Sequence, residues 1–288
     1  MDGGAGLSPA TLTALIALVR KHTGIAMTER KSVLLEGRLR PRMRALQIES
    51  YQGYLDKVEQ DRAEVPHFID LVTTNDTLFF RTPQVWTYVE KEFLPQWSRE
   101  HPGKRLKIWS AAAASGEELY SMAMLCEEFA AANPGFSYQI HATDISRQIL
   151  EVARAGKYGG RSVEKIQATH PDWVKKYFRP SGDSGGLQVV DALKKHVELA
   201  QHNLLVPLKP NKQFDLVFLR NVLIYFDQEH TETVLRQAAL SMAPHARLIV
   251  GESESISGLN TAYQFVRPMI YQIEQADYHA NNNNQREQ

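Results

Sequence analysis

The chain has 288 residues, with 33 lysines and arginines against 33 acidic residues and a single cysteine. This length allows a full hydrophobic core in one large domain or two. The zero net charge gives no global indication of nucleic acid or of a membrane surface as a partner. One cysteine excludes an internal disulfide. The sequence shows no signal peptide and no apolar run of about 18 residues, so we expect a cytoplasmic protein without membrane insertion.

Residues 1–72 are expected to form a small all-helical domain. Spacings of three and four residues, typical of amphipathic helices, recur in two apolar sets: Leu12, Leu15, Ile16 and Val19, then Leu35, Leu39, Met43 and Leu46. Residues 1–48 carry eight lysines and arginines against three acids, and residues 49–76 carry two against seven. The zero net charge therefore hides a basic segment followed by an acidic one.

Four arginines flank the second apolar set: Arg38, Arg40, Arg42 and Arg44. They form two pairs at a spacing of four residues, so each pair shares a helix face. One interpretation is a solvated basic face. The other is a docking face for an acidic helical partner, in which the arginines mainly steer association and set its register.

Residues 73–83 read Thr-Thr-Asn-Asp-Thr-Leu-Phe-Phe-Arg-Thr-Pro. Thr, Asn and Asp favour turns, because their side chains compete for backbone hydrogen bonds. Two phenylalanines and an arginine are unusual in such a polar run. The segment is either an ordinary linker with a hydrophobic anchor, or a connector whose aromatic residues pack on the second domain while its polar groups face a ligand.

Residues 106–120 predict a buried strand, a loop of small residues and a helix. This is the opening unit of a nucleotide-type α/β site. The loop holds one glycine, so the dinucleotide fingerprint is absent. Glu117 and Glu118 in the first helical turn would repel a pyrophosphate. These features favour a ligand with positive charge and no phosphate, such as S-adenosylmethionine. Cys126 lies in the apolar stripe of the helix, and we expect it in the core.

Residues 138–144 predict a second strand that ends in Asp144, with Ser146 capping the next helix. An acid at this position can accept both ribose hydroxyls of a nucleoside. The alternative is a turn-forming Asp without a ligand.

The alternation of strands and helices is interrupted at residues 156–196. Glycines and short apolar runs there predict an inserted subdomain, a β-ribbon with one helix. Further strands are expected at 197–205, 214–219 and 246–251, a helix at 228–242, and a terminal strand pair at 263–266 and 269–274. Residues 84–277 thus form an α/β, Rossmann-like domain, and the asparagine-rich tail 278–288 is expected to be disordered.

Four motifs together resemble one family, the chemotaxis receptor methyltransferases (CheR family). In order, they are Thr-Asn-Asp-Thr-Leu-Phe-Phe-Arg, Ser-Ala-Ala-Ala-Ala-Ser-Gly-Glu-Glu-Leu-Tyr-Ser, Ala-Thr-Asp-Ile-Ser and Arg-Asn-Val-Leu-Ile-Tyr-Phe. With the basic N-terminal helices they cover nearly the whole chain. The sequence departs from the family pattern at several positions, among them Leu119, where the family has Pro, and Glu252, where it has His.

The resemblance implies transfer of the methyl group of S-adenosylmethionine to glutamate γ-carboxylates of methyl-accepting chemoreceptors, with S-adenosylhomocysteine as the product. The partner would be the cytoplasmic helical bundle of a receptor, and we expect a monomer. By motif, the catalytic residues are Arg81 and Tyr225, and the cofactor-binding residues are Asn75, Thr77, Arg81, Glu117, Asp144, Asn203, Leu204, Arg220 and Asn221.

A glutamate carboxylate is already ionised at neutral pH, with an unperturbed pKa near 4.3, so this reaction needs no general base. None of the ten histidines has a convincing metal-ligand spacing, and no metal is expected. Two other classes of function stay open. One is a non-catalytic docking or sensing module that binds S-adenosylmethionine without turnover. The other is an NAD-dependent oxidoreductase, which the missing glycine fingerprint makes less favourable.

Overall fold

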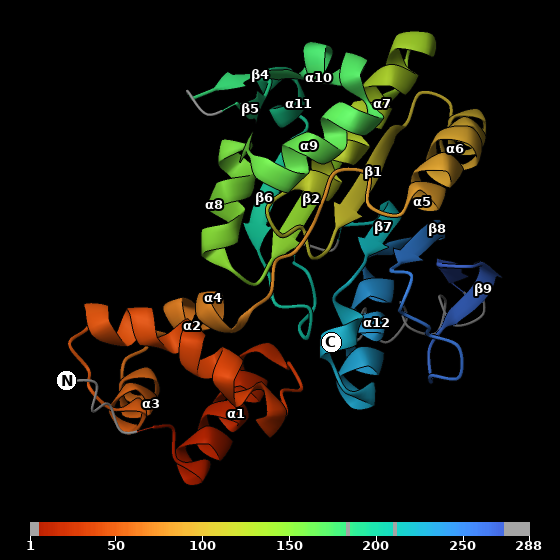
Figure 1. The fold of residues 1–288 in the computed structure, drawn as a ribbon. Coiled ribbons are helices and arrows are strands. Elements are labelled where there is room, and N and C mark those ends of the chain that lie inside the picture. The colour runs from red at the N-terminus through yellow and green to blue at the C-terminus, as the bar shows by residue number, and fades with distance from the viewer. Residues whose placement is uncertain (1–5, 183–184, 210–211, 274–288) are drawn as a thin grey trace.

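The computed structural model describes residues 6–182, 185–209 and 212–273. A small helical domain (red to orange in Figure 1) lies beside a larger α/β domain, and an inserted unit caps the far end of the latter. The tail predicted at 278–288 lies outside the described residues.

The N-terminal domain is a cluster of helices, as its periodicity predicts. The elements are α1 (Pro9–Thr23), the 3₁₀ turn η1 (Glu29–Lys31), α2 (Ser32–Ala45), α3 (Tyr51–Gln60) and α4 (Val65–Val72). The Ser8 hydroxyl caps the start of α1, and Gly24 ends the helix at φ 75°, a conformation that glycine adopts without strain. Leu15, Leu35 and Leu39 are fully buried where the helices meet.

The linker leads into a helical run that covers one face of the large domain. This run comprises α5 (Pro83–Tyr88), the π-helical turn η2 (Val89–Phe93) and α6 (Leu94–Glu100). The remaining helices of the domain outside the insert are α7 (Glu117–Ala132), α8 (Arg147–Ala155) and α12 (Gln228–Leu240).

The main sheet has seven strands: β1 (Arg105–Ser110), β2 (Ser137–Asp144), β6 (Val197–Gln201), β7 (Phe214–Leu219), β8 (Met242–Val250), β9 (Tyr263–Arg267) and β10 (Ile270–Ile273). Their order is β6-β2-β1-β7-β8-β10-β9. The first five are parallel, and β10 pairs antiparallel with both of its neighbours. The strand order reverses direction between β1 and β7, which is where doubly wound sheets bind ligands.

Alternating residues of the strands point to opposite faces of the sheet and contribute to two hydrophobic cores. Ile108, Ile140 and Phe218 pack under α5 to α7 on one face. Trp109, Val217 and Leu248 pack against α12 on the other. Cys126 belongs to the first core and is fully buried, as predicted. Burial on both faces explains why the 214–219 segment is a continuous apolar run apart from Asp215.

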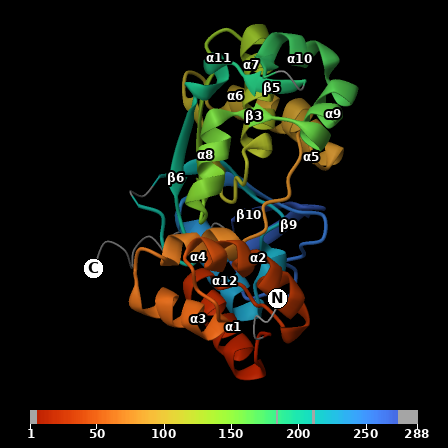
Figure 2. The same cartoon turned by 60° about the vertical axis from the view of Figure 1, so that its left-hand side comes forward.

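The insert between α8 and β6 differs from the prediction. A three-stranded antiparallel sheet is present, formed by β3 (Lys157–Tyr158), β4 (Phe178–Ser181) and β5 (Gly186–Val189). It carries three helices, α9 (Gly160–Thr169), α10 (Pro171–Tyr177) and α11 (Asp191–Lys194), where the sequence predicted one. Figure 2 shows these elements grouped at the end of the molecule away from α1 and α3.

Candidate cofactor site

A pocket opens at the carboxyl ends of the parallel strands, at the switch point between β1 and β7. It is lined by the linker, by the loops after β1, β2, β6 and β7, and by the N-terminal domain. Its lining includes Asn75, Thr77, Arg81, Asp144, Asn203, Leu204, Arg220, Asn221 and Tyr225. These are the predicted site residues apart from Glu117 and the α2 arginines, so segments far apart in sequence come together here.

Asp144 ends β2 with its carboxylate fixed by backbone donors. The N–H groups of Ala114 and Ser146 each donate to it at 3.0 Å. Ala114 has φ 47°, an uncommon value for a residue with a side chain, and the hydrogen bond to Asp144 helps hold it there. Burial raises the pKa of Asp144, and the backbone donors oppose that rise. A buried carboxylate with free lone pairs suits a pair of ribose hydroxyls.

An ion pair forms the floor of the pocket. Arg220 Nη1 donates to Glu118 Oε2 at 3.0 Å, and Glu118 also accepts a hydrogen bond from the Ser110 hydroxyl. Both charged side chains are almost fully buried. Burial raises the pKa of Glu118, while the Arg220 guanidinium lowers it. Such a buried pair fixes the orientation of both side chains, but its net contribution to the free energy of unfolding is small because both charges are desolvated.

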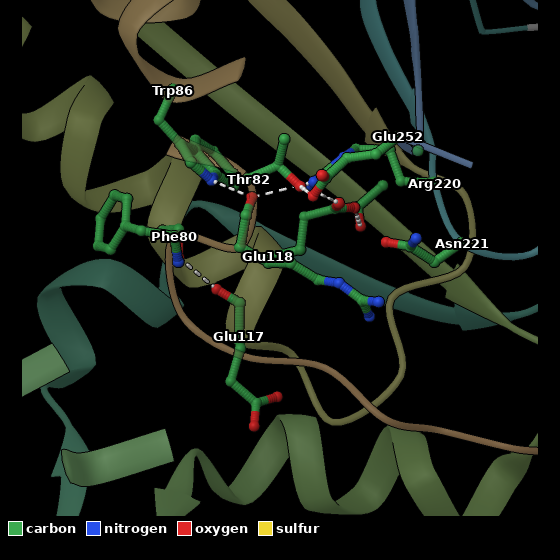
Figure 3. A network of polar contacts seen from close by, with 12 residues as sticks. Phe80, Thr82, Trp86, Glu117, Glu118, Arg220, Asn221 and Glu252 are labelled. Atoms are coloured by element: carbon green, nitrogen blue, oxygen red, sulfur yellow. Dashed lines mark hydrogen bonds and ion pairs between the residues drawn. The ribbon is translucent and has the colours of Figure 1, made fainter. Parts of the chain in front are cut away.

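The linker is bound to this floor. Arg220 Nη2 and Trp86 Nε1 both donate to the carbonyl oxygen of Arg81, at 2.9 and 2.8 Å. The Thr82 hydroxyl donates to Glu252 at 2.5 Å, and Figure 3 shows these groups converging around Arg220 and Glu118. Phe80 and Thr82 have φ values of 51° and 62°. The turn that carries Arg81 is therefore strained and held from both sides.

The linker's aromatic residues pack on the second domain while its polar residues face the pocket. Phe79 and Phe80 are buried in the core of the large domain, and Phe80 stacks on His170 of the insert. Asn75, Thr77 and Arg81 line the pocket. The packing of the aromatic residues on the second domain agrees with the connector interpretation, whereas contact of the polar groups with a ligand stays a prediction.

Glu254 was not predicted as a site residue, yet it shapes one wall. Its carboxylate accepts hydrogen bonds from the N–H groups of Asn221, Val222 and Leu223, each at 2.8 Å, and from Gly251. Asn221 has φ 58° within this bracket. A Cβ on Gly251 would lie 2.6 Å from the Glu254 side chain and 2.7 Å from that of Asn221, so any larger residue would displace these groups.

The two adjacent glutamates of α7 have different environments. Glu118 lines the pocket. Glu117, the residue chosen from the sequence, accepts a hydrogen bond from Ser115 in the loop after β1 at 2.5 Å and one from Ser162 of the insert at 2.7 Å. Burial raises its pKa. A role of Glu117 in cofactor binding stays a prediction, and would require its side chain to leave these hydroxyls.

The N-terminal domain closes one side of the pocket, which the sequence did not indicate. Thr23 and Ile25 are part of the lining. The Asn203 side chain donates to the His22 carbonyl at 3.2 Å, and the Ala26 N–H donates to the Tyr225 carbonyl at 2.8 Å. Both contacts join α1 or the segment after it to the loops that flank the pocket.

The α2 arginines do not form one uniform face. Arg42 makes a two-point ion pair with buried Glu64, at 2.9 and 2.7 Å. Arg40 bonds Tyr51 and Glu36, and Arg38 donates to the Val72 carbonyl and the Thr74 hydroxyl. Arg44 is exposed, without a side-chain partner among the described residues. Their docking role stays a prediction.

The donor and acceptor set fits S-adenosylmethionine. Arg220 Nε is buried without a hydrogen-bond partner among the described residues, so the floor retains a free donor. Three carboxylates and three amides contribute to the polar lining, and the loop after β1 lacks the glycine-rich sequence of common dinucleotide sites. No group of three or more His, Cys, Asp and Glu side chains in the described part of the chain could hold a metal ion. No described helix is both long and apolar enough to cross a membrane.

The mostly parallel sheet with its antiparallel β10, and the pocket at its switch point, suit a methyltransferase of the S-adenosylmethionine-dependent class. Family models agree. Residues 10–73 match the CheR methyltransferase all-alpha domain, and residues 75–271 match the CheR methyltransferase SAM-binding domain. The chain belongs to the CheR methyltransferase family.

Curated relatives support this assignment over most of the chain. The chemotaxis protein methyltransferase Cher2 of Pseudomonas putida is 33% identical over 262 residues, covering 88% of this chain and 94% of that protein. Chemotaxis protein methyltransferase 1 of Vibrio cholerae is 35% identical, with 86% and 90% covered. The chemotaxis protein methyltransferase of Escherichia coli is 32% identical, with 93% and 92% covered.

Proposed function

We propose that this protein methylates glutamate γ-carboxylates on the cytoplasmic helices of chemoreceptors. The observation that carries the proposal is that Arg81 and Tyr225, from the linker and from the turn after β7, line the same pocket as Asp144. The relatives' names support a chemotaxis role. The methylated residue, the receptor substrate and the cytoplasmic location are part of this proposal and not of the family assignment.

The low pKa of a histidine in the pocket lining favours a carboxylate acceptor. This residue is His202, the one histidine among the described lining residues, and burial together with nearby His141 lowers its pKa to about 4. So weak a base would abstract a proton poorly at neutral pH. A carboxylate needs no deprotonation, whereas an alcohol acceptor would need a base.

S-adenosylmethionine, when bound, supplies an electrophilic methyl group on a positively charged sulfur. The protein's task is alignment of the acceptor oxygen, where positioning contributes about 7–11 kcal/mol at best. Arg81 would orient the incoming carboxylate, because its guanidinium reaches the Asp76 carbonyl at 3.1 Å and keeps free donors. Tyr225 would orient by hydrogen bonding. Asp144 would hold the ribose.

The test is transfer of tritiated methyl groups to receptor-enriched membranes, followed by alkaline release of methanol. Release identifies a carboxyl methyl ester, while label that resists alkali would contradict the glutamate assignment. Arg81→Ala is expected to lower the rate about a hundredfold with folding retained. Arg99→Ala, which removes an exposed arginine of α6 outside the pocket lining, is the control. Binding of S-adenosylhomocysteine with no transfer to any receptor would instead support the docking or sensing module.

A further inference from the structure

A second cleft, here termed the aromatic cleft, lies between the helical run after the linker and the insert. Its volume is about 500 Å³, within the range of small-molecule sites. Its walls come mainly from the linker's Phe80, from α5 and the start of η2, and from α9 and α10. Figure 2 shows α5 beside α9. Among the described residues, none lines both this cleft and the cofactor pocket.

Four aromatic rings in contact with one another form the inner surface of the cleft. Phe80 stacks on His170, with ring centroids 4.1 Å apart, and meets Trp86 edge-on at 5.4 Å. Trp173 lies 4.8 Å from His170 and 5.5 Å from Phe80. Phe80 and Trp86 are buried, whereas His170 and Trp173 are half-buried and leave ring surface open to the cleft. Rings that hold one another in place can bind an apolar group at little entropic cost.

Two unpaired charges of opposite sign line the same cleft. Glu90 is on η2 and Lys165 is on α9, so they come from different walls. Neither side chain makes a hydrogen bond or an ion pair with another described residue. Burial lowers the pKa of His170, Glu90 opposes that shift and Lys165 adds to it, so both charges lie near this ring. The remaining charged residue of the lining, Asp172, is paired with Lys175 at 3.0 Å.

The inner wall of the cleft is also the support of the turn that holds Arg81. Phe80, which precedes Arg81 at φ 51°, donates its N–H to the Ser121 hydroxyl at 3.0 Å. Trp86 Nε1 donates to the Arg81 carbonyl at 2.8 Å. Figure 3 shows Phe80 and Asn221, a residue of the cofactor pocket, on opposite sides of this turn. A ligand packed against Phe80 and Trp86 would therefore restrain the turn from behind.

We propose that the aromatic cleft binds a free α-amino acid with an apolar side chain, and that this ligand acts on the cofactor pocket through the turn that holds Arg81. The ligand's ammonium group would pair with Glu90 and its carboxylate with Lys165, while its side chain packs against Trp173. A zwitterion satisfies both protein charges with one molecule, whereas a simple organic cation or anion leaves one of them unpaired. This inference goes beyond the receptor assignment, and every readout below is a binding constant.

The first test is calorimetric titration of the full chain with L-phenylalanine. We expect a dissociation constant of about 1 mM, typical of efficient binding for a ligand of this size. Two probes each lack one charge: 3-phenylpropionate has no ammonium group and phenethylamine has no carboxylate. Each should bind at least about tenfold more weakly, the effect of losing one charged hydrogen bond. No saturable binding of L-phenylalanine, or equal binding of the three probes, would overturn the proposal.

Substitutions assign each charge to its partner. Glu90→Gln should remove the preference for L-phenylalanine over 3-phenylpropionate, and Lys165→Met the preference over phenethylamine. A folding defect would weaken all probes alike and would not produce this exchange of preferences. Glu100→Gln on α6 and Lys175→Met on α10 remove exposed charges outside the lining and should change neither preference. If Glu90→Gln and Lys165→Met keep the parent's preferences, the ligand does not bind in this cleft.

The second test measures coupling between the cleft and the cofactor pocket. Saturating L-phenylalanine should tighten S-adenosylhomocysteine binding about fivefold, and S-adenosylhomocysteine should tighten L-phenylalanine binding by the same factor. Trp173→Leu should abolish this coupling while leaving the affinity for S-adenosylhomocysteine alone unchanged. Binding of L-phenylalanine with no effect on S-adenosylhomocysteine would overturn the action through the Arg81 turn. Failure to methylate receptors would overturn the proposed function and leave these binding results intact.

Discussion

The floor and the mouth of the pocket use the same kind of ion pair in opposite settings. At the floor, Arg220 and Glu118 are 2% and 11% exposed and share further partners in the backbone and Ser110. At the mouth, Arg161 and Asp76 lie 2.8 Å apart but are 68% and 63% exposed. A buried charge that loses its partner has no water to replace it, whereas an exposed one does. The floor is therefore fixed before any ligand arrives, and the mouth can adapt to a large partner.

The largest effect should come from breaking the floor pair. Glu118→Ala leaves the Arg220 guanidinium buried and unpaired, and is expected to lower the free energy of unfolding by about 3–5 kcal/mol. Arg161→Ala, its counterpart at the mouth, should lower it by less than about 1 kcal/mol. Urea unfolding of both variants measures the difference. Equal losses would mean that the floor and the mouth do not differ in the way their burial implies.

Asp144→Ala tests the pocket as a ligand site. Loss of a charged acceptor should weaken S-adenosylhomocysteine binding by about 1–3 kcal/mol in calorimetry. Asp172→Ala, which removes an exposed carboxylate on α10, serves as the control. Unchanged affinity in the Asp144 variant would remove this residue from the site.

Most of the fold was predictable because buried faces of helices and strands require apolar residues at regular spacings in the sequence. The strand at 214–219 and the Ser146-capped helix were found from apolar runs and a capping residue, and the structure contains both. The sequence predicted one helix in the insert where the structure has three. The signal was weak because α9, for example, offers only Val163 and Ile166 as buried residues and begins at glycines without a side-chain cap. Short helices with so little apolar periodicity leave a weak signal.

The lining of the pocket was predictable where a charged residue follows a clear strand, as at Asp144. It was not predictable where two adjacent residues of the same type could each line the pocket. Glu117 and Glu118 differ by 100° around α7, and no local pattern says which of them meets the pocket. Glu254 acts through backbone N–H groups, and Thr23 acts through domain contact. Such roles depend on tertiary placement, which leaves no spacing rule in the sequence.

His202, which lines the pocket, should make the free energy of unfolding depend on pH. Its folded value of about 4 lies below the ordinary 6.5, so the unfolded chain binds more protons between these pH values. The stability contributed by neutral His202 is complete above pH 6.5 and is lost as pH falls towards 4. Discounted for its partial exposure, this amounts to at most about 2 kcal/mol.

His202→Gln should therefore flatten the fall in unfolding free energy between pH 7 and pH 4.5 relative to the parent. Nearby His141, whose pKa burial also lowers, is kept in both proteins. Urea unfolding at several pH values gives the slopes. Parallel slopes for variant and parent would show that His202 titrates normally in the folded protein.

The smallest effect is expected from the exposed arginines of α2. Arg40→Glu with Arg44→Glu reverses charge on the solvent side of the helix, and should raise the receptor KM about threefold at low salt without changing cofactor affinity. Added salt should reduce the difference between variant and parent, because exposed charges are screened over about 8 Å at physiological ionic strength.

Arg42→Ala separates docking from folding within the same helix. Burial raises the pKa of Glu64, but bonds from Arg42 and Tyr54 outweigh it and hold that pKa below its usual value. Removing Arg42 leaves this carboxylate, which is 3% exposed, without its cation, so the variant should be less stable by about 2–3 kcal/mol. If the Arg40 and Arg44 reversals leave the receptor KM unchanged at low salt while the protein stays folded, these two arginines form a solvated face and the receptor docks elsewhere.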